Sequence, residues 1–503
     1  MATWSQHISS NTTEWALGIT ATALVGGCTA YCLYKWVSTP RNLPPGPRGL
    51  PFLGALPWLS SELHQDFIRF GVKYKSEVVS FYTGNSLTVA LNSERVIRDA
   101  FAKEEFSGRP VDLAAIFHTN DMLFSAPFSQ PWRKNKKFMM QTLRKFGFGT
   151  PKAEEKIKKQ LANLQEVIDA SESKTWSKDQ LDDCLSKVTA NIIMDIVFAS
   201  TYDFDDAQMH DLIRTTLEVQ SVFVNEGSLI ALFLFVFPKW FTRLLFFRTI
   251  RRAIATQAKL YNITSKQLEV HRNRLTDASE PKDFLDAALQ EFKDQPDITD
   301  KHVIDTVIVL LPDAIEGVAS QIQWCLYFLV SHPSNQRRMV EEIKAVCGKR
   351  LPTLQDKTKL PFCECVILEA LRLSTLFTTS APHMTTADTT LEGYNIPAGS
   401  TVLANIYAVH HDPETFSLPG EFNPDRFLKE SGAIDYSSSL IPFCTGRRMC
   451  IGEALVKSEV FLALTHLVFL YHMTSKDTPP SIEEVKGIFR RVPEYEIVFT
   501  KRM

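Results

Sequence analysis

Hydrophobic and polar positions follow a helical period over most of the chain. Apolar residues recur every three to four positions, which is typical of helices with one buried face. Four stretches have this pattern, the second with an interruption: residues 63–75, 153–275, 303–330 and 453–471. Period-two alternation is confined to short runs, and residues 78–82 and 86–91 predict a β-hairpin. We therefore expect a mainly α fold with small β-sheets.

The N-terminal segment has a different pattern. Residues 15–34 are twenty residues without a charge. A helix of this length crosses the roughly 30 Å hydrocarbon core of a bilayer. Basic residues follow the run from Lys35 onward and none precedes it, which places residues 1–14 in a lumen and the rest in the cytosol. A cleaved signal peptide is the alternative, but its usual basic start is missing, so we expect a single transmembrane anchor.

A proline-rich segment joins this anchor to the remainder of the chain. Four prolines stand between Pro44 and Pro51, and each removes a backbone donor and restricts the residue before it. Residues 35–54 are therefore expected to form a stiff, extended hinge. No repeat or further linker divides residues 55–503, which we expect to form one large domain.

The composition is that of a globular protein and excludes several classes of function. Of 503 residues, 45% are hydrophobic and 22% are charged. The net charge of −2 gives no electrostatic support to a nucleic-acid partner. Nine cysteines, an odd number without paired zinc-type spacing, argue against a disulfide framework. The body of the chain is therefore expected in a reducing compartment.

The interruption of the second helical stretch is unusually apolar. Residues 229–237 form a nine-residue apolar run, and Trp, Lys and Arg interleave with apolar residues up to position 247. Nine residues are too few to span a bilayer. Core packing is one interpretation, and a surface that dips into the membrane is the other. The interleaving favours membrane contact by residues 229–247.

The candidate chemistry is concentrated in one stretch near the C-terminus. Five residues stand there at set spacing: Phe443, Gly446, Arg448, Cys450 and Gly452. A thiolate that ligates iron needs a tight loop with backbone N–H groups facing the sulfur, and the two glycines allow a sharp turn close to a flat ligand. Arg448 offers a guanidinium fork to a carboxylate such as a haem propionate, and Phe443 can shield the sulfur. The alternative is a structural cysteine in a glycine-containing loop.

This stretch resembles the haem-binding signature of the cytochrome P450 family. The resemblance implies the cytochrome P450 fold, with haem b as cofactor, Cys450 as the iron ligand and Arg448 as a propionate partner. It extends from about residue 15 to the C-terminus, because further motifs follow in the family's order. The proline-rich hinge resembles that of microsomal members, and residues 229–247 match the loop between the family's F and G helices. The closest pattern is that of the animal clan with many drug- and steroid-metabolising members.

The long helix at residues 303–330 departs from the family at one position. The segment 313–317 stands where the family has [AG]-G-x-[DE]-T, so Glu316 retains the acid and Gly317 replaces the threonine. Pro312 and Gly317 predict a local break in the helix. In the family the threonine hydroxyl helps to deliver protons. Here Glu316 with water, Ser320 or a substrate hydroxyl would take over this role, unless Glu316 is merely a surface or capping acid.

Three further residues are candidates for contact with the haem propionates. Trp132 and Lys136 are four apart and share one face of a basic amphipathic helix. The family has Trp-x-x-x-Arg here, so Lys136 keeps the charge but not the bidentate fork. The resemblance also implies that His383 donates to a propionate. Met384 stands where many relatives have an Arg.

An acid and a base three residues apart form another motif. Glu369 and Arg372 share one face of an apolar helix. Such pairs are usually surface ion pairs of little energetic value. The resemblance matches them to the family's E-x-x-R and matches Arg426 to its F-x-P-x-R-F. The three residues would form a structural triad behind the haem.

Together these features predict a haem-thiolate monooxygenase anchored in the endoplasmic reticulum membrane. It would insert one oxygen atom from dioxygen into a steroid, sterol, fatty acid derivative or xenobiotic. No dinucleotide fingerprint is visible, so electrons would come from a separate NADPH-cytochrome P450 reductase, with cytochrome b5 as a further candidate donor. The alternatives are an isomerase or dehydratase that acts on an oxygenated lipid or peroxide without a reductase, and a haem-binding protein of low turnover.

Overall fold

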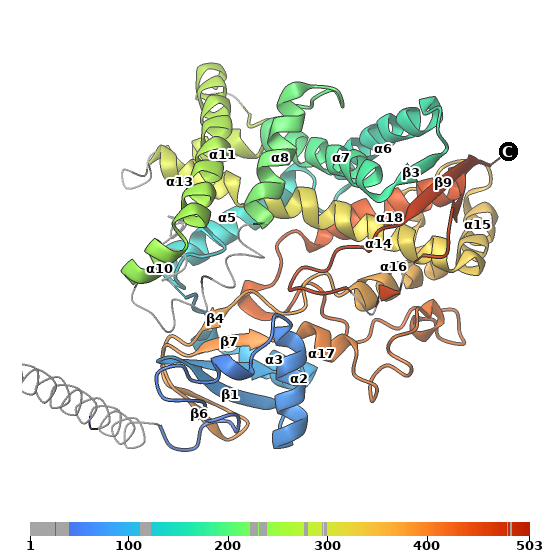
Figure 1. Cartoon of the computed structure of the whole chain (residues 1–503). Coiled ribbons are helices and arrows are strands. Elements are labelled where there is room, and N and C mark those ends of the chain that lie inside the picture. The colour runs from blue at the N-terminus through green and yellow to red at the C-terminus, as the bar shows by residue number, and fades with distance from the viewer. Residues whose placement is uncertain are drawn as a thin grey trace, which may run out of the picture.

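The computed structural model describes most of the chain after the predicted anchor (Figure 1). The described residues are 40–110, 122–221, 239–275, 280–293, 295, 299–479, 481–482 and 485–502, together with Gly26 and Ile230. The predicted anchor at 15–34, except Gly26, and residues 229–238, except Ile230, lie outside this set. Within it, no helix has both the length and the apolar character of a membrane span.

The described chain is mainly helical, as the periodicity predicts. The α-helices are α2 (Leu63–Tyr74), α3 (Glu94–Ala102), α5 (Gln130–Phe146), α6 (Pro151–Ala170), α7 (Lys178–Phe198), α8 (Ala207–Ser221), α10 (Lys239–Leu245), α11 (Phe247–Arg274), α12 (Phe284–Phe292), α13 (Asp300–Ile308), α14 (Val318–Ser331), α15 (Pro333–Cys347), α16 (Pro361–Ser374), α17 (Ile406–His410) and α18 (Glu453–Leu470). Short 3₁₀ turns cover Leu56–Trp58, Glu104–Ser107, Leu354–Lys359, Pro424–Phe427 and Gly446–Arg448.

The strands form three small sheets. The largest has the order β1-β2-β7-β4, and the other two have the orders β3-β9-β8 and β5-β6. Their bounds are β1 (Val78–Thr83), β2 (Ser86–Leu91), β3 (Thr175–Ser177), β4 (His383–Met384), β5 (Thr389–Leu391), β6 (Tyr394–Ile396), β7 (Thr401–Ala404), β8 (Tyr471–Ser475) and β9 (Glu496–Lys501). The predicted hairpin is confirmed, because β1 and β2 pair antiparallel around a two-residue turn. Strand β7 joins β2 in parallel, so segments over 300 residues apart lie side by side in the lower part of Figure 1.

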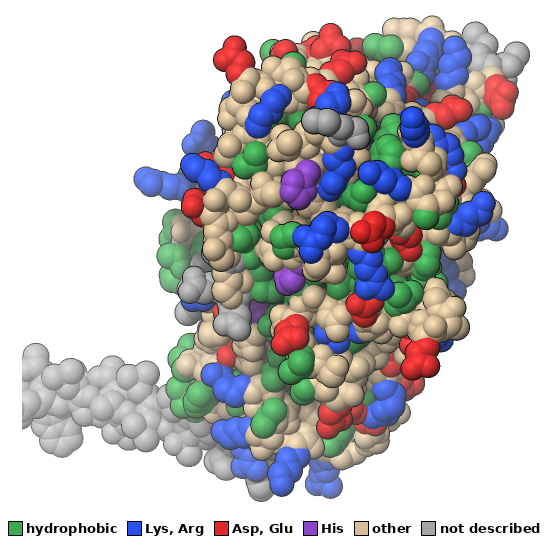
Figure 2. Space-filling view, turned by 90° about the vertical axis from the view of Figure 1, so that its right-hand side faces the viewer, with side chains coloured by type: hydrophobic (Ala, Val, Ile, Leu, Met, Phe, Trp, Pro, Cys, Tyr) green, Lys and Arg blue, Asp and Glu red, His purple; other side chains and the backbone are tan. Residues whose placement is uncertain are grey.

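The surface carries charges of both signs. Figure 2 shows the face on the right-hand side of Figure 1, where Lys and Arg side chains are interspersed with Asp and Glu. This distribution agrees with the net charge of −2 for the whole chain. Such a mixed surface favours solubility without a strong long-range field.

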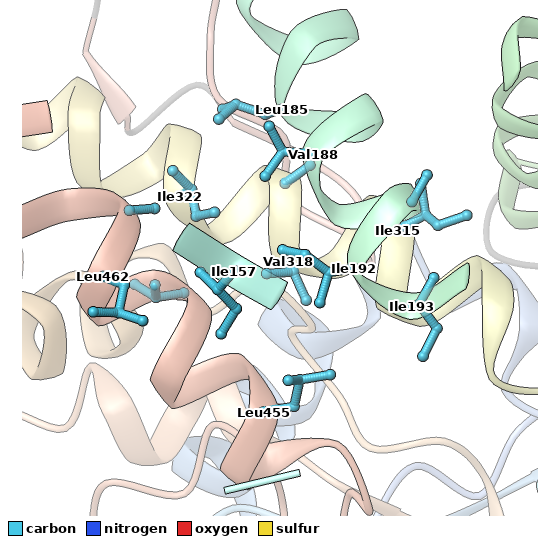
Figure 3. Close-up of a cluster of buried hydrophobic side chains, with 14 of the residues drawn as sticks. Ile157, Leu185, Val188, Ile192, Ile193, Ile315, Val318, Ile322, Leu455 and Leu462 are labelled. Atoms are coloured by element: carbon cyan, nitrogen blue, oxygen red, sulfur yellow. The ribbon is translucent and has the colours of Figure 1, made fainter. Parts of the chain in front are cut away.

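Helix α14 lies at the centre of the hydrophobic core. Residues 318–330 are all buried, which is typical of a helix that has neighbours on every side. Figure 3 shows Val318 and Ile322 among side chains of α7, such as Val188, and of α18, such as Leu462. Helix α14 also packs against α16. The π-helical segment that precedes α14 therefore adjoins the hydrophobic core of the molecule.

The helix predicted over residues 303–330 is broken, as its proline and glycine indicate. Helix α13 ends at Ile308, residues 313–317 form a π-helical segment, and α14 begins at Val318. Pro312 caps the π-helical segment and has no N–H to continue an α-helical ladder. The Thr189 hydroxyl of α7 donates a 2.9 Å hydrogen bond to the carbonyl of Ile315. A side chain from a neighbouring helix thus supports the wide turn, a feature frequent at functional sites.

Glu369, Arg372 and Arg426 meet in one buried network. Arg372 donates from Nε and Nη2 to the two carboxylate oxygens of Glu369, at 2.7 and 2.8 Å. Arg426 donates from Nε to the same carboxylate at 2.9 Å. The side chains of Glu369 and Arg372 are 0% exposed. Arg372 Nη1 also donates to the carbonyls of His410 and Pro419, at 2.7 and 2.8 Å. The interpretation as a surface ion pair is therefore wrong.

Glu369→Gln is expected to lower the free energy of unfolding by about 3 kcal/mol or more, because two guanidinium groups lose their carboxylate in a buried setting. The thermal midpoint of unfolding measures the loss. Asp425→Asn is the matched control: Asp425 also holds an arginine, Arg338, through both oxygens at 2.7 and 2.9 Å, but its side chain is 53% exposed. That variant should lose less than about 1 kcal/mol. If both variants lost the same free energy of unfolding, burial would not explain the contribution of Glu369.

Thr189→Val is expected to lower the thermal midpoint through the loss of about 1 kcal/mol, because the Ile315 carbonyl loses the Thr189 hydroxyl and is left with the Val318 N–H as donor. Thr216→Val is the control. The Thr216 hydroxyl is also buried and bonds the carbonyls of Leu212 and Ile213 at 2.9 and 2.8 Å, but both belong to its own helix. A Thr189→Val effect no larger than that of the control would show that the bond does not support the π-helical segment.

Candidate active site

The loop that carries Cys450 is shaped by a close approach to α3. Gly446 has φ +80°, and a Cβ atom there would lie 2.3 Å from the carbonyl oxygen of Phe101. No side chain fits in this space, so glycine is required by the neighbouring helix. Gly452 has φ −82°, and a Cβ atom there would lie 3.7 Å from Cys450 Sγ, an ordinary contact. The Cys450 N–H closes the loop with a 3.1 Å bond to the carbonyl of Phe443.

A histidine links this loop to the buried Glu369 network. The Ile441 N–H donates to His410 Nε2 at 3.0 Å, and the His410 carbonyl accepts from Arg372. Burial, with the charge of Arg372, lowers the pKa of His410 to about 3, so the ring is neutral. Its Nδ1 therefore carries the proton and donates to Thr375 Oγ1 at 3.0 Å. A chain of hydrogen bonds that begins at Glu369 therefore fixes the backbone of Ile441, which stands two positions before Phe443.

Cys450 is an exposed residue whose thiol is nevertheless largely surrounded by protein atoms. Burial raises the pKa of its thiol to about 11, and the backbone N–H groups of Gly452 and Glu453, which face the sulfur, oppose this shift. The expectation of N–H groups directed at the sulfur therefore agrees with the structure. Because the free thiol holds its proton at neutral pH, a bound cation is needed to stabilise the thiolate.

Two arginines, the half-buried Arg448 of the loop and the buried Arg109, lie close together. Arg448 donates from Nε and both Nη atoms to the carbonyls of Ser107, Leu123 and Ala126, at 2.8 to 3.0 Å. Burial, and then the charge of Arg109, lower the pKa of Arg448 to about 9. Burial lowers the pKa of Arg109 to about 10.

Arg109 was not a predicted site residue. It bonds the carbonyls of Phe124 and Pro382, at 3.0 and 2.8 Å. Two neighbouring cations, one buried and one half-buried, are suited to an anionic ligand, since a pair of carboxylates would neutralise both. Together with the exposed residue Cys450, they fit the haem that the resemblance implies.

Trp132 and Lys136 lie in the same cluster, but their donors have protein partners. The Trp132 indole N–H donates to the carbonyl of Leu123 at 3.0 Å, and the Arg448 guanidinium lies 4.0 Å from the indole centroid. Lys136 Nζ donates to the carbonyl of Arg447, and burial, then Arg448, lower its pKa. Contact of either group with a propionate stays a prediction that requires these bonds to be exchanged.

His383 stacks on Phe101 with ring centroids 3.9 Å apart, and its Nδ1 lies 2.8 Å from the carbonyl of Phe106. Burial lowers its pKa well below the ordinary value, so the ring is neutral and Nδ1 donates. Nε2 is then an acceptor. Donation to a propionate, as the resemblance implies, therefore requires a second proton on this ring.

Glu316 is buried at the end of the π-helical segment. It is 3% exposed, its Oε1 accepts from Arg491, and its Oε2 has no hydrogen-bond partner among the described residues. Burial raises its pKa to about 7, although the charge of Arg491 opposes the shift. The interpretation of Glu316 as a surface acid is therefore wrong. Arg491, which the sequence did not point to, holds an acid that exchanges protons near neutral pH.

The other two residues predicted on this helix differ in their surroundings. A Cβ atom at Gly317 would have no neighbour within 4 Å, so the helix is open at this position. Ser320 is 5% exposed at the start of α14. The structure thus has open space where the family's threonine hydroxyl would stand.

Comparison with known proteins gives one consistent result. The profile of one family, described as Cytochrome P450, matches residues 44–499. The chain is 30% identical to rat cytochrome P450 2J3, over 90% of this chain and 89% of the relative. It is 31% identical to goat cytochrome P450 2F3, over 88% of this chain and 90% of the relative.

A solved structure agrees with these sequence matches. A zebrafish cytochrome P450 determined with progesterone superposes with a TM-score of 0.76 and 25% identity, over 87% of this chain and 99% of the other. Fold, family profile and curated relatives therefore lead to the same assignment. The chain belongs to the cytochrome P450 family and is a monooxygenase of the animal microsomal type, with a haem held by a cysteine thiolate.

Proposed function

We propose that this monooxygenase inserts one oxygen atom from dioxygen into a lipophilic small molecule, with Cys450 as the ligand of the haem iron. The observation that carries the proposal is the exposed residue Cys450 in a loop whose Arg448 lies close to the buried Arg109. The haem supplies oxygen activation, since a thiolate ligand favours O–O cleavage.

The protein holds the cofactor at two places. The backbone N–H groups of Gly452 and Glu453 stabilise the thiolate of Cys450, and Phe443 and the Gly446 turn keep the loop in shape. Arg448 and Arg109 bind the propionates. Trp132, Lys136 and His383 surround this pair of arginines and complete the binding site. Glu369, Arg372 and Arg426 hold the loop from behind and take no part in the chemistry.

Glu316, on the π-helical segment, would hold and transfer protons. A carboxyl group with a pKa of about 7 can donate and accept a proton at neutral pH. Arg491 orients it through one oxygen, and the second oxygen remains for water. Gly317 provides no hydroxyl, so water or Ser320 must continue the path toward the substrate.

The substrate class we propose is a steroid, sterol, fatty acid derivative or xenobiotic. The zebrafish relative solved with progesterone supports a lipophilic ligand of this size. The surface around α10 supports access from a membrane, because four of its large apolar side chains are more than half exposed: Trp240, Leu244, Leu245 and Phe247. We propose the endoplasmic reticulum membrane as the location, with residues 15–34 as the single-pass anchor and the catalytic domain in the cytosol.

The electron donor we propose is NADPH-cytochrome P450 reductase, with cytochrome b5 as a further donor. The surface of helix α5 near Lys136 supports docking of such an electron donor. The first half of this helix has three exposed cations, Arg133, Lys134 and Lys137. Exposed cations of this kind favour an acidic protein surface and make association sensitive to salt.

A second candidate function follows from Gly317. The missing hydroxyl at this position suits a reaction that does not activate dioxygen. A haem-thiolate isomerase or dehydratase that rearranges a lipid peroxide is such an enzyme, and it also needs no reductase. A haem-binding protein of low turnover is the third candidate.

The experiment incubates the haem-loaded full chain with steroid, fatty acid and lipid peroxide panels, with and without NADPH and reductase. We expect oxygenated products only when both are present. Product from a peroxide in their absence would favour the isomerase instead. The reduced, carbon-monoxide-bound wild type should have the red-shifted Soret band of thiolate ligation, and Cys450→Ser should lose it. A Cys450→Ser variant that retains this band would refute Cys450 as the ligand.

Glu316→Gln is expected to change how stability depends on pH. The folded chain holds a proton on Glu316 up to a pKa of about 7, whereas the ordinary value is 4.5. Between these values folding takes up a proton, so the stability of the wild type falls as pH rises. Residue 316 does not titrate in the variant. The free energy of unfolding of the variant minus that of the wild type should therefore increase by up to about 3 kcal/mol between pH 4.5 and pH 8.

Thermal midpoints of Glu316→Gln and wild type across this pH range measure the effect. The exposed Glu414→Gln controls for the loss of one carboxylate. A difference between Glu316→Gln and wild type that stays constant with pH would show that Glu316 is ionised throughout.

A further inference from the structure

Three buried side chains with metal-ligating atoms meet where α11 ends and α12 begins. His271 lies in the last turn of α11, Asp283 is the N-cap of α12, and Asp286 follows in the first turn of α12. Each residue is at most 1% exposed. One ligand atom of each lies within 4.8 Å of those of the other two, and no second group of this kind occurs in the part of the chain that the structure describes. None of the three residues belongs to the haem site.

The imidazole of His271 has an oxygen acceptor at each ring nitrogen. Nδ1 lies 2.7 Å from the carbonyl of Gln267, and Nε2 lies 2.9 Å from Oδ2 of Asp283. A neutral imidazole carries one N–H, so one of these contacts would join two acceptors. The ring therefore needs either a second proton or a metal ion at Nε2. Donation from the other ring nitrogen to a carbonyl is the usual way in which a metal-binding histidine is oriented.

The carboxylate of Asp286 gives an independent indication of a ligand. Its Oδ2 accepts from the backbone N–H of Lys282 at 3.1 Å and from Arg274 at 3.0 Å. Its Oδ1 is buried and has no hydrogen-bond partner within the described ranges. A carboxylate oxygen without a donor is unfavourable in the protein interior, and a cation bound to it would remove this cost.

The charges of the cluster allow a divalent cation to enter. Arg274 donates from Nη2 to Oδ2 of both Asp283 and Asp286, and its side chain is 35% exposed. A divalent ion between the three ligands replaces two positive charges, the guanidinium of Arg274 and the second proton of His271. This exchange leaves the net charge of the buried cluster unchanged, so it strands no carboxylate. Arg274 is the last residue of α11 and can turn toward solvent.

We propose that His271, Asp283 and Asp286 form a zinc-binding site that links the end of α11 to the start of α12. Arg274 is the group that the ion displaces. One imidazole nitrogen and two carboxylate oxygens are a ligand set of Zn²⁺, and water takes the fourth position. Ca²⁺ and Mg²⁺ prefer oxygen ligands alone. Because α12 packs against α5, α7 and α13, the ion ties α11 to this part of the fold. The inference goes beyond the proposed function and requires neither haem chemistry nor turnover.

The test titrates Zn²⁺ into the haem-loaded full chain after dialysis against a chelator. Isothermal titration calorimetry should give one equivalent with a dissociation constant of about 1 μM or lower. Zinc should also raise the thermal midpoint, because the site exists only in the folded chain. X-ray absorption at the zinc edge should show nitrogen and oxygen ligands at about 2.0–2.2 Å. A wild type that binds no zinc, or zinc with sulfur among its ligands, would overturn the proposal.

Two variants with matched controls separate a zinc site from an ion-pair network. Arg274→Gln removes the competing guanidinium and should bind Zn²⁺ about tenfold more tightly, equivalent to about 1.4 kcal/mol. Its control is Arg272→Gln, because Arg272 stands in the same turn and bonds Asp300 outside the cluster, at 2.7 Å. Asp286→Asn should weaken binding at least tenfold, and Asp300→Asn should leave it unchanged.

An Arg274→Gln variant that binds zinc no more tightly than Arg272→Gln would show that the cluster is an ion-pair network only. This comparison keeps all three ligands, so it remains decisive if Asp286→Asn does not fold. No NADPH, reductase or substrate is involved, so failure of the monooxygenase reaction leaves the test unaffected.

Discussion

The rest of the site depends on the burial of one carboxylate with two guanidinium groups. Glu369 accepts from Arg372 and Arg426, and Arg372 extends the network to His410, which in turn holds the backbone at Ile441. Each of these charges would be strongly unfavourable alone in the protein interior, so they are stable only together. The Cys450 loop therefore receives its position from an electrostatic network in which none of its own residues takes part.

The two sides of the site follow opposite electrostatic rules. Near the Cys450 loop, Arg448 and Arg109 are close together and lose solvent, which prepares them for an anionic group. On the π-helical segment, burial raises the pKa of Glu316 to about 7, so this carboxyl group is partly neutral at neutral pH.

Local patterns in the sequence were sufficient for several parts of the structure. The hairpin of β1 and β2 follows from strict alternation, and the break before α14 follows from Pro312. The meeting of Glu369 and Arg372 was predictable because their spacing alone puts them on one helix face. These features depend on residues close together in the chain.

Other parts were beyond the reach of sequence reasoning because they depend on distant partners. Arg109 and Arg491 look like ordinary basic residues until Pro382 and Glu316 are placed beside them. The indole of Trp132 bonds the Leu123 carbonyl, and no spacing rule indicates that choice. Gly446 was assigned to close approach of a flat ligand, whereas the carbonyl of Phe101 already excludes any side chain there.

The contact between the Cys450 loop and the segment after α3 has a consequence for biosynthesis. Arg448 bonds the carbonyl of Ser107, 341 residues earlier in the chain. Closing a loop of this length carries a large entropy loss, and the rest of the fold must compensate for it. The segment with Ser107 and Arg109 is synthesised long before Cys450, so the two halves of the site come together only when the C-terminal part of the chain is present. Haem capture by both halves is therefore a late step in biosynthesis.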